Sequence, residues 1–149
     1  MDRARREVIV WARYTAWLLA PVEKLPYKFR YKGYKDEKLK FPEVSTEYMV
    51  QWLQDMGKCV NDGMGVTGFS WTEIRNWADL NCVELDPWEA TTLRDASFEY
   101  AAMLQEARDI HTKCPWAEAP PTKVFVDVAM RSGFAAIINA QNTKKGRPQ

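Results

Sequence analysis

The stretch Asp86-Pro-Trp-Glu-Ala-Thr-Thr-Leu-Arg-Asp-Ala-Ser-Phe-Glu-Tyr100 predicts the longest helix of the chain. Asp86 suits the N-cap, and Pro87 suits the first helical position, where a missing N–H costs nothing. Glu89 follows near the positive end of the helix. Apolar residues then recur at helical spacing: Leu93, Ala96, Tyr100, Leu104 and Ala107. We therefore expect a helix over residues 86–110.

Similar signals predict helices on both sides of this one. Ser70-Trp-Thr-Glu73 is a capping box, in which the hydroxyl and the carboxylate satisfy two backbone N–H groups of the first turn. The other segments carry apolar residues at helical spacing. The five predicted helices cover residues 2–20, 43–60, 70–80, 86–110 and 122–140.

The connecting segments contain aromatic, glycine and proline residues. Residues 24–40 alternate aromatic and basic side chains, which suits a short strand, a hairpin or an ordered loop. Residues 61–68 hold three glycines and are predicted to be a loop, without a phosphate-binding pattern. Prolines at 115, 120 and 121 mark a linker, and residues 142–149 a polar tail.

The predicted fold is thus all-α. We expect a small bundle of four to five helices with a basic N-terminal arm, in which a short β-hairpin is one alternative. The division along the chain is a helix and basic arm in 1–44, an acidic helical core in 45–110, and a linker, last helix and tail in 111–149.

Composition and charge agree with one globular domain. The chain has 149 residues, of which 46% are apolar and 28% charged. Its net charge of +1 conceals segments of +6 in residues 1–40, −9 in 41–110 and +4 in 111–149. Such segments can satisfy one another within a chain or between copies. The latter alternative predicts self-association through the N-terminal Arg3, Arg5 and Arg6.

The sequence gives little indication of a metal site, a membrane segment or export. The three cysteines are odd in number and far apart, as in a protein of a reducing compartment. A zinc site would need Cys59, Cys82, His111 and Cys114, of which only the last two are close, so buried thiols are favoured. No stretch approaches the roughly 20 apolar residues of a membrane span, and the charged start lacks signal-peptide character. We expect no metal and no cofactor.

Residues that could carry catalysis are few. The chain has one histidine and no hydrolase, metalloprotease or P-loop motif. Cys114 and His111 could form a nucleophile–base pair on a helix, but the Cys114–Pro115 bond disfavours a helix there. The protein is therefore predicted not to be an enzyme.

Nucleic acid is the alternative partner that the sequence leaves open. The aromatic and basic residues of 24–40 could stack bases and contact phosphates, although covering one end of the core is the simpler interpretation. The helices 70–80 and 86–110 could form a helix-turn-helix, but the second begins with acidic residues that repel phosphate. We regard nucleic acid as the less favoured partner.

Residues 48–104, about the central third to two-fifths of the chain, resemble the tail assembly chaperones, or minor tail proteins, of long-tailed bacteriophages. The pattern positions are Trp71, Glu73, Ile74, Trp77, Leu80, Trp88, Glu89, Leu93 and Tyr100. Each could be a core residue or a partner contact, and the spacing of Trp77, Leu93 and Tyr100 favours the core.

The resemblance implies a non-catalytic helical adaptor in the host cytoplasm. Such proteins bind the tape-measure protein and keep it soluble until tail-tube subunits polymerise around it. In some phages the family segment is the downstream part of a frameshifted product. The alternatives are a phage nucleic-acid-binding or packaging accessory protein and an inhibitor of a host protein.

Overall fold

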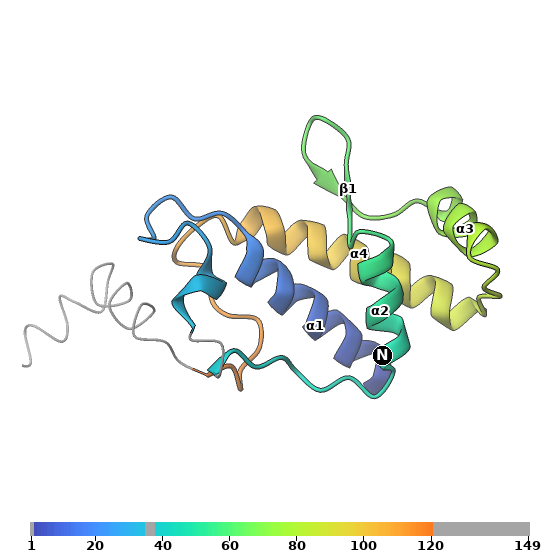
Figure 1. The fold of residues 1–149 in the computed structure, drawn as a ribbon, viewed down its shortest axis with the longest axis horizontal. Helices are drawn as coiled ribbons and strands as arrows, with labels where there is room; N and C mark the ends of the chain where they lie inside the picture. The colour runs from blue at the N-terminus through green and yellow to red at the C-terminus, as the bar shows by residue number, and fades with distance from the viewer. Residues whose placement is uncertain (1, 35–37, 121–149) are drawn as a thin grey trace, which may run out of the picture.

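The computed structural model describes residues 2–34 and 38–120 (Figure 1). Within them lie four α-helices, one 3-10 helix and one two-stranded antiparallel hairpin. The elements in chain order are α1 (Arg3–Leu19), η1 (Arg30–Gly33), α2 (Glu47–Asp55), β1 (Val60–Asn61), β2 (Val66–Thr67), α3 (Trp71–Leu80) and α4 (Pro87–Glu106). The all-α prediction is confirmed, and the predicted helix 122–140 and the tail 142–149 lie outside the described residues.

The helix α1 packs against α4 in a parallel arrangement (Figure 1). The pairing order shows the direction, because Arg5 forms an ion pair with Asp95 and Arg13 forms one with Glu99. Small residues on both helices are fully buried, which is consistent with close packing. These residues are Ala12 and Ala16 on α1 and Ala96 and Ser97 on α4. A parallel pair needs a long connection, and residues 20–86 supply it.

One hydrophobic cluster holds the described elements together. It contains residues of α1, α2, α3 and α4, and the cysteine and tryptophan of the segment 114–116 pack against it. Ser97 connects this cluster to the start of α3, because its hydroxyl accepts a hydrogen bond of 2.8 Å from the Phe69 N–H. Residues from all three predicted segments of the chain therefore share one core. Among the described residues, none of the helices combines the length and apolar character needed to cross a bilayer.

The predicted short hairpin occurs at a different place. Residues 60–67 form it, with Val60 opposite Thr67, although the sequence predicted a loop there. Its turn uses glycines at positive φ, Gly63 at 87° and Gly65 at 154°. Of the predicted segment 24–40, the described residues 24–34 and 38–40 form an ordered loop instead, with a bridge between Pro21 and Phe29 and a 3-10 turn at Arg30–Gly33.

Two predicted helices are shorter than expected. The helix predicted over 43–60 ends at Asp55, because Gly57 adopts a left-handed φ of 92° and its N–H bonds the Gln54 carbonyl. The helix predicted to reach about residue 110 ends at Glu106. Beyond it, the carbonyls of Ala107 and Asp109 accept hydrogen bonds from Arg30 instead.

Arg30 connects the C-terminal ends of α1 and α4. Its side chain is 2% exposed, and its guanidinium donates to the carbonyls of Trp17 at 3.1 Å, Ala107 at 2.5 Å and Asp109 at 2.8 Å. The guanidinium carbon also lies 4.8 Å from the centre of the Trp17 ring. Burial lowers the pKa of Arg30 to about 10, so the side chain stays charged at neutral pH. A single cation thus caps two helix ends, each with a negative partial charge.

We predict that Arg30→Met lowers the free energy of unfolding by about 3 kcal/mol, because it leaves three carbonyls without their donor. The free energy of unfolding of Arg30→Lys should lie between those of the wild type and Arg30→Met, since an ammonium keeps the charge but lacks the planar fork of the guanidinium. Urea denaturation measures both changes. The exposed neighbour Lys32→Met is the control and should stay within about 0.5 kcal/mol of the wild type. Equal stability of Arg30→Met and Lys32→Met would contradict the capping role.

Candidate functional site

Three of the nine pattern positions lie in the hydrophobic core. Ile74, Leu93 and Tyr100 are 2%, 0% and 4% exposed. Burial raises the pKa of Tyr100 to about 12, so its hydroxyl stays protonated at neutral pH. These three side chains face the interior and are core residues. Leu93 and Tyr100 present no surface to a partner, whereas Ile74 also lines a groove on the surface.

Both glutamates of the pattern serve as helix caps. The Glu73 carboxylate accepts from the Ser70 N–H at 2.7 Å, and the Ser70 hydroxyl accepts from the Glu73 N–H at 3.1 Å. Asp86 and Glu89 repeat the arrangement at the start of α4, at 2.7 and 3.1 Å. Both sequence-predicted caps are confirmed. Hydrogen bonds to backbone N–H groups therefore explain both glutamates.

Trp77 and Trp88 are partly buried and hold elements together. The Trp77 ring packs edge-on against Trp52 of α2, with ring centres 5.8 Å apart. The Trp88 indole N–H donates to Asp2 at 2.9 Å, and the second oxygen of Asp2 accepts from the Arg5 N–H at 2.8 Å. Asp2 therefore caps α1 and also binds the first turn of α4.

Trp71 and Leu80, the two remaining pattern positions, are exposed. Their exposed fractions are 53% and 84%, and no core role explains them. The Arg94 guanidinium lies 5.1 Å from the Trp71 ring centre and 4.7 Å from that of Phe98. The backbone at Gly68 also approaches Phe98 closely, since a Cβ at this position would lie 2.3 Å from the ring. Trp71 is thus held in place by stacking while much of its surface stays exposed.

A groove of about 670 Å³ lies between α3 and the beginning of α4. Its apolar lining includes Ile74, Ala78, Val83, Leu85 and Ala90, with Trp71 at one side. The Asp79 and Glu84 carboxylates also line it, and neither forms an ion pair within the described part of the chain. Among the described residues that line the groove, Arg75 is the one cation. The groove therefore combines an apolar lining with two carboxylates and one guanidinium.

The arginines predicted to mediate self-association lie near the start of α4. Arg5 forms an ion pair with Asp95 of the same chain, and Arg3 forms one with Glu7. Arg6 is exposed. Of the three, Arg3 and Arg5 therefore already form ion pairs within the chain, and the self-association of this arm stays a prediction.

The thiols and the histidine do not come together. Among residues 2–34 and 38–120, no three His, Cys, Asp or Glu side chains are placed to hold a metal ion. Burial raises the pKa of the Cys59 and Cys114 thiols, which disfavours the thiolate that metal binding and nucleophilic attack require. The Cys114 thiol donates to the Trp116 carbonyl at 3.4 Å.

The Trp88–Asp2 hydrogen bond makes a pH-dependent contribution to stability. Together with the Arg5 N–H, it holds the pKa of the Asp2 carboxyl below its ordinary value of 3.8. Because the pKa of Asp2 is lower in the folded protein than in the unfolded protein, the stabilisation is present above the pKa of the unfolded state. It is lost as the pH falls through the pKa of the folded state.

We therefore expect Trp88→Phe, which removes only the N–H donor and some ring area, to lower the melting temperature most at neutral pH. The difference from the wild type should shrink at acid pH, as the pH falls below 3.8 and the Asp2 carboxyl takes up a proton. Thermal melts at the two pH values measure this effect. A difference of the same size at both would show that Trp88 acts through packing alone.

Comparison of the chain with protein-family models, with curated proteins and with solved structures gave no match. Among the described residues, the α3–α4 groove and the exposed Trp71 are the features of this site that a partner could contact.

Proposed function

We propose that the protein is a non-catalytic adaptor, a bacteriophage tail assembly chaperone that binds the tape-measure protein in the host cytoplasm. The observation that carries this proposal is the α3–α4 groove with the half-exposed Trp71 at its side. The resemblance in residues 48–104 names the partner, and the groove supplies a surface that suits it.

The groove has the properties of a protein-binding site. Its floor is apolar, and indole rings at such positions contribute more to binding than most other side chains. Stacking against Arg94 limits the freedom of the Trp71 ring, so less conformational entropy is lost when a partner covers it. Helices that expose apolar side chains beside a groove commonly accept an amphipathic helix of a partner.

The carboxylates that line the groove favour a partner segment that is basic as well as apolar. Asp79 and Glu84 border the groove, and Glu73 and Glu89 are on the same two helices. Lysine or arginine on the partner would meet these carboxylates, which fixes the register of binding more than it adds affinity. An inhibitor of a host protein would use the same surface, and the identity of the bound protein separates the two functions.

We predict that the full chain binds the tape-measure protein of the same genome and suppresses its aggregation, measured by light scattering. Trp71→Ala should weaken binding at least about tenfold, as expected when an indole that a partner covers is lost from an interface. Met64→Ala is the control, because Met64 is 98% exposed at the hairpin turn, outside the groove.

Both variants should keep the wild-type melting temperature to within a few degrees. Aggregation of the tape-measure protein that is the same with and without the chain would refute the chaperone function. Equal binding by the Trp71→Ala variant and the wild type would refute the groove as the site.

A further inference from the structure

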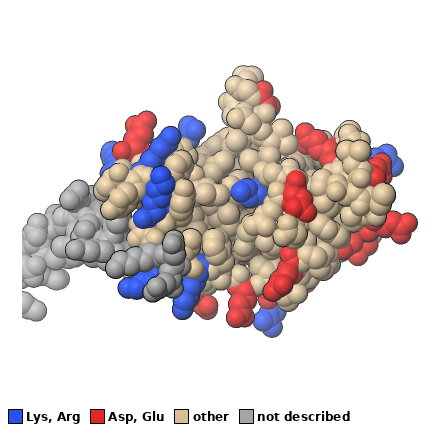
Figure 2. All heavy atoms as spheres, viewed as in Figure 1, with Lys and Arg blue, Asp and Glu red and all other residues tan. Residues whose placement is uncertain are grey.

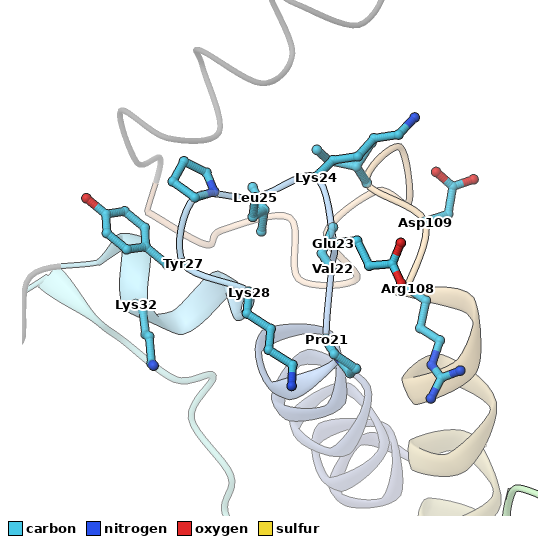
Figure 3. A pocket seen from close by; sticks show the side chains of 12 residues that line it. Pro21, Val22, Glu23, Lys24, Leu25, Tyr27, Lys28, Lys32, Arg108 and Asp109 are labelled. Carbon is cyan, nitrogen blue, oxygen red and sulfur yellow. The ribbon is translucent and has the colours of Figure 1, made fainter.

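A cleft of about 1140 Å³ lies at the end of the molecule where α1 and α4 both terminate (Figure 3). The loop of residues 21–28, the Lys32 side chain and residues 108–110 line it. The α3–α4 groove is at the other end of α4, a helix about 30 Å long at 1.5 Å per residue. The cleft is therefore a separate site, which the proposed chaperone function does not use.

The loop that forms the cleft has a fixed backbone. The Val22 N–H donates to the Lys28 carbonyl at 2.6 Å, and the Leu25 N–H donates to the Val22 carbonyl at 3.3 Å. Val22 and Leu25 are 1% and 7% exposed, so two apolar side chains anchor the loop in the protein. The exposed residues between and beside these anchors are consequently presented on a preformed surface.

Four cations line the cleft: Lys24, Lys28, Lys32 and Arg108. None forms an ion pair with a carboxylate of the described residues. Figure 3 shows Lys28, Lys32 and Arg108 extending from the backbone toward one side, whereas Lys24 extends the other way. Glu23 and Asp109 also line the cleft, but one Asp109 oxygen already accepts the His111 N–H at 2.9 Å. The cleft thus has an excess of positive charge.

Aromatic rings accompany these cations. Tyr27 lines the cleft and is 51% exposed. The ammonium groups of Lys28 and Lys32 lie 5.4 and 5.5 Å from the centre of the Phe29 ring, which in turn stacks on Tyr31 at 5.7 Å. Two positive charges therefore lie around the Phe29 ring, and the half-exposed Tyr27 supplies a further ring in the lining of the cleft.

We propose that this cleft binds single-stranded nucleic acid. Lys28, Lys32 and Arg108 contact the phosphates, and Tyr27 stacks on a base. Proteins that bind single strands without sequence preference combine a positive groove with aromatic rings in this way. An acidic peptide would satisfy the cations equally well but has no planar base for Tyr27. The near-neutral net charge of the chain does not oppose binding, because the acidic residues of α3 and early α4 lie at the other end.

The test is the binding of fluorescently labelled single-stranded DNA and RNA of mixed sequence, followed by anisotropy at several salt concentrations. The logarithm of affinity should fall against that of salt with a slope of about −2, as for three phosphates in a single strand. Lys28→Gln/Lys32→Gln should weaken binding about tenfold at low salt and reduce the slope by about 1.4. Tyr27→Leu should weaken it about fivefold and leave the slope unchanged.

The matched control is Arg3→Gln/Arg6→Gln, which removes the same charge near the start of α1, away from the cleft. It should change the affinity by less than about twofold, and circular dichroism should show all variants folded. Four results would overturn the proposal: no binding at low salt, equal loss in the control, displacement by polyglutamate as effective as by the oligonucleotide, or self-association of the chain in place of binding.

Discussion

The buried guanidinium of Arg30 is the interaction on which the rest of the arrangement depends. Two parallel helices place two C-terminal ends, each with unpaired carbonyls and a negative partial charge, side by side. Arg30 donates to one carbonyl of α1 and to two at and beyond the end of α4. The same residue fixes the basic arm against both helices. The pairing of α1 with α4, the path of residues 21–34 and the shape of the cleft therefore have one common support.

The parallel pair also explains how the charge of the chain is distributed in space. Asp2, Asp86 and Glu89 cap or flank the N-terminal ends of α1 and α4, where helix dipoles favour negative charge. Lys24, Lys28 and Lys32 lie beyond the C-terminal ends, where the dipoles favour positive charge. Figure 2 shows most of the lysines and arginines of this face at the end of the basic arm, and most of the carboxylates toward α3. The described part of the chain thus has two ends of opposite charge, although the whole sequence has a net charge of +1.

Local signals in the sequence predicted the helices well. Ser70 with Glu73 and Asp86 with Glu89 form the predicted capping boxes, because a cap depends only on residues three positions apart. The features that local signals do not predict depend on contacts between residues that are far apart in the sequence. The burial of Arg30 depends on carbonyls 77 and 79 residues away, and no periodicity in residues 24–40 indicates it.

The same limit on prediction from local signals applies to the candidate site, as the tryptophans of the pattern show. The pattern has the same residue type at Trp71, Trp77 and Trp88. In the structure Trp71 is exposed, Trp77 packs on Trp52, and the Trp88 indole N–H donates to Asp2. Helical spacing favours the core for Trp77, and the structure shows this side chain to be partly buried. It could not identify Trp71 as the exposed indole, because that depends on how α3 packs against α4.

The paired helices depend most on one cation that supports both of their C-terminal ends at once. Hydrogen–deuterium exchange of the wild type and Arg30→Lys, followed at the last turns of α1 and α4, tests it most directly. The account predicts that protection falls at both turns together, while the first turns, capped by Asp2 and Asp86, keep theirs. Loss at only one turn, or uniform loss along both helices, would contradict a shared cap at Arg30.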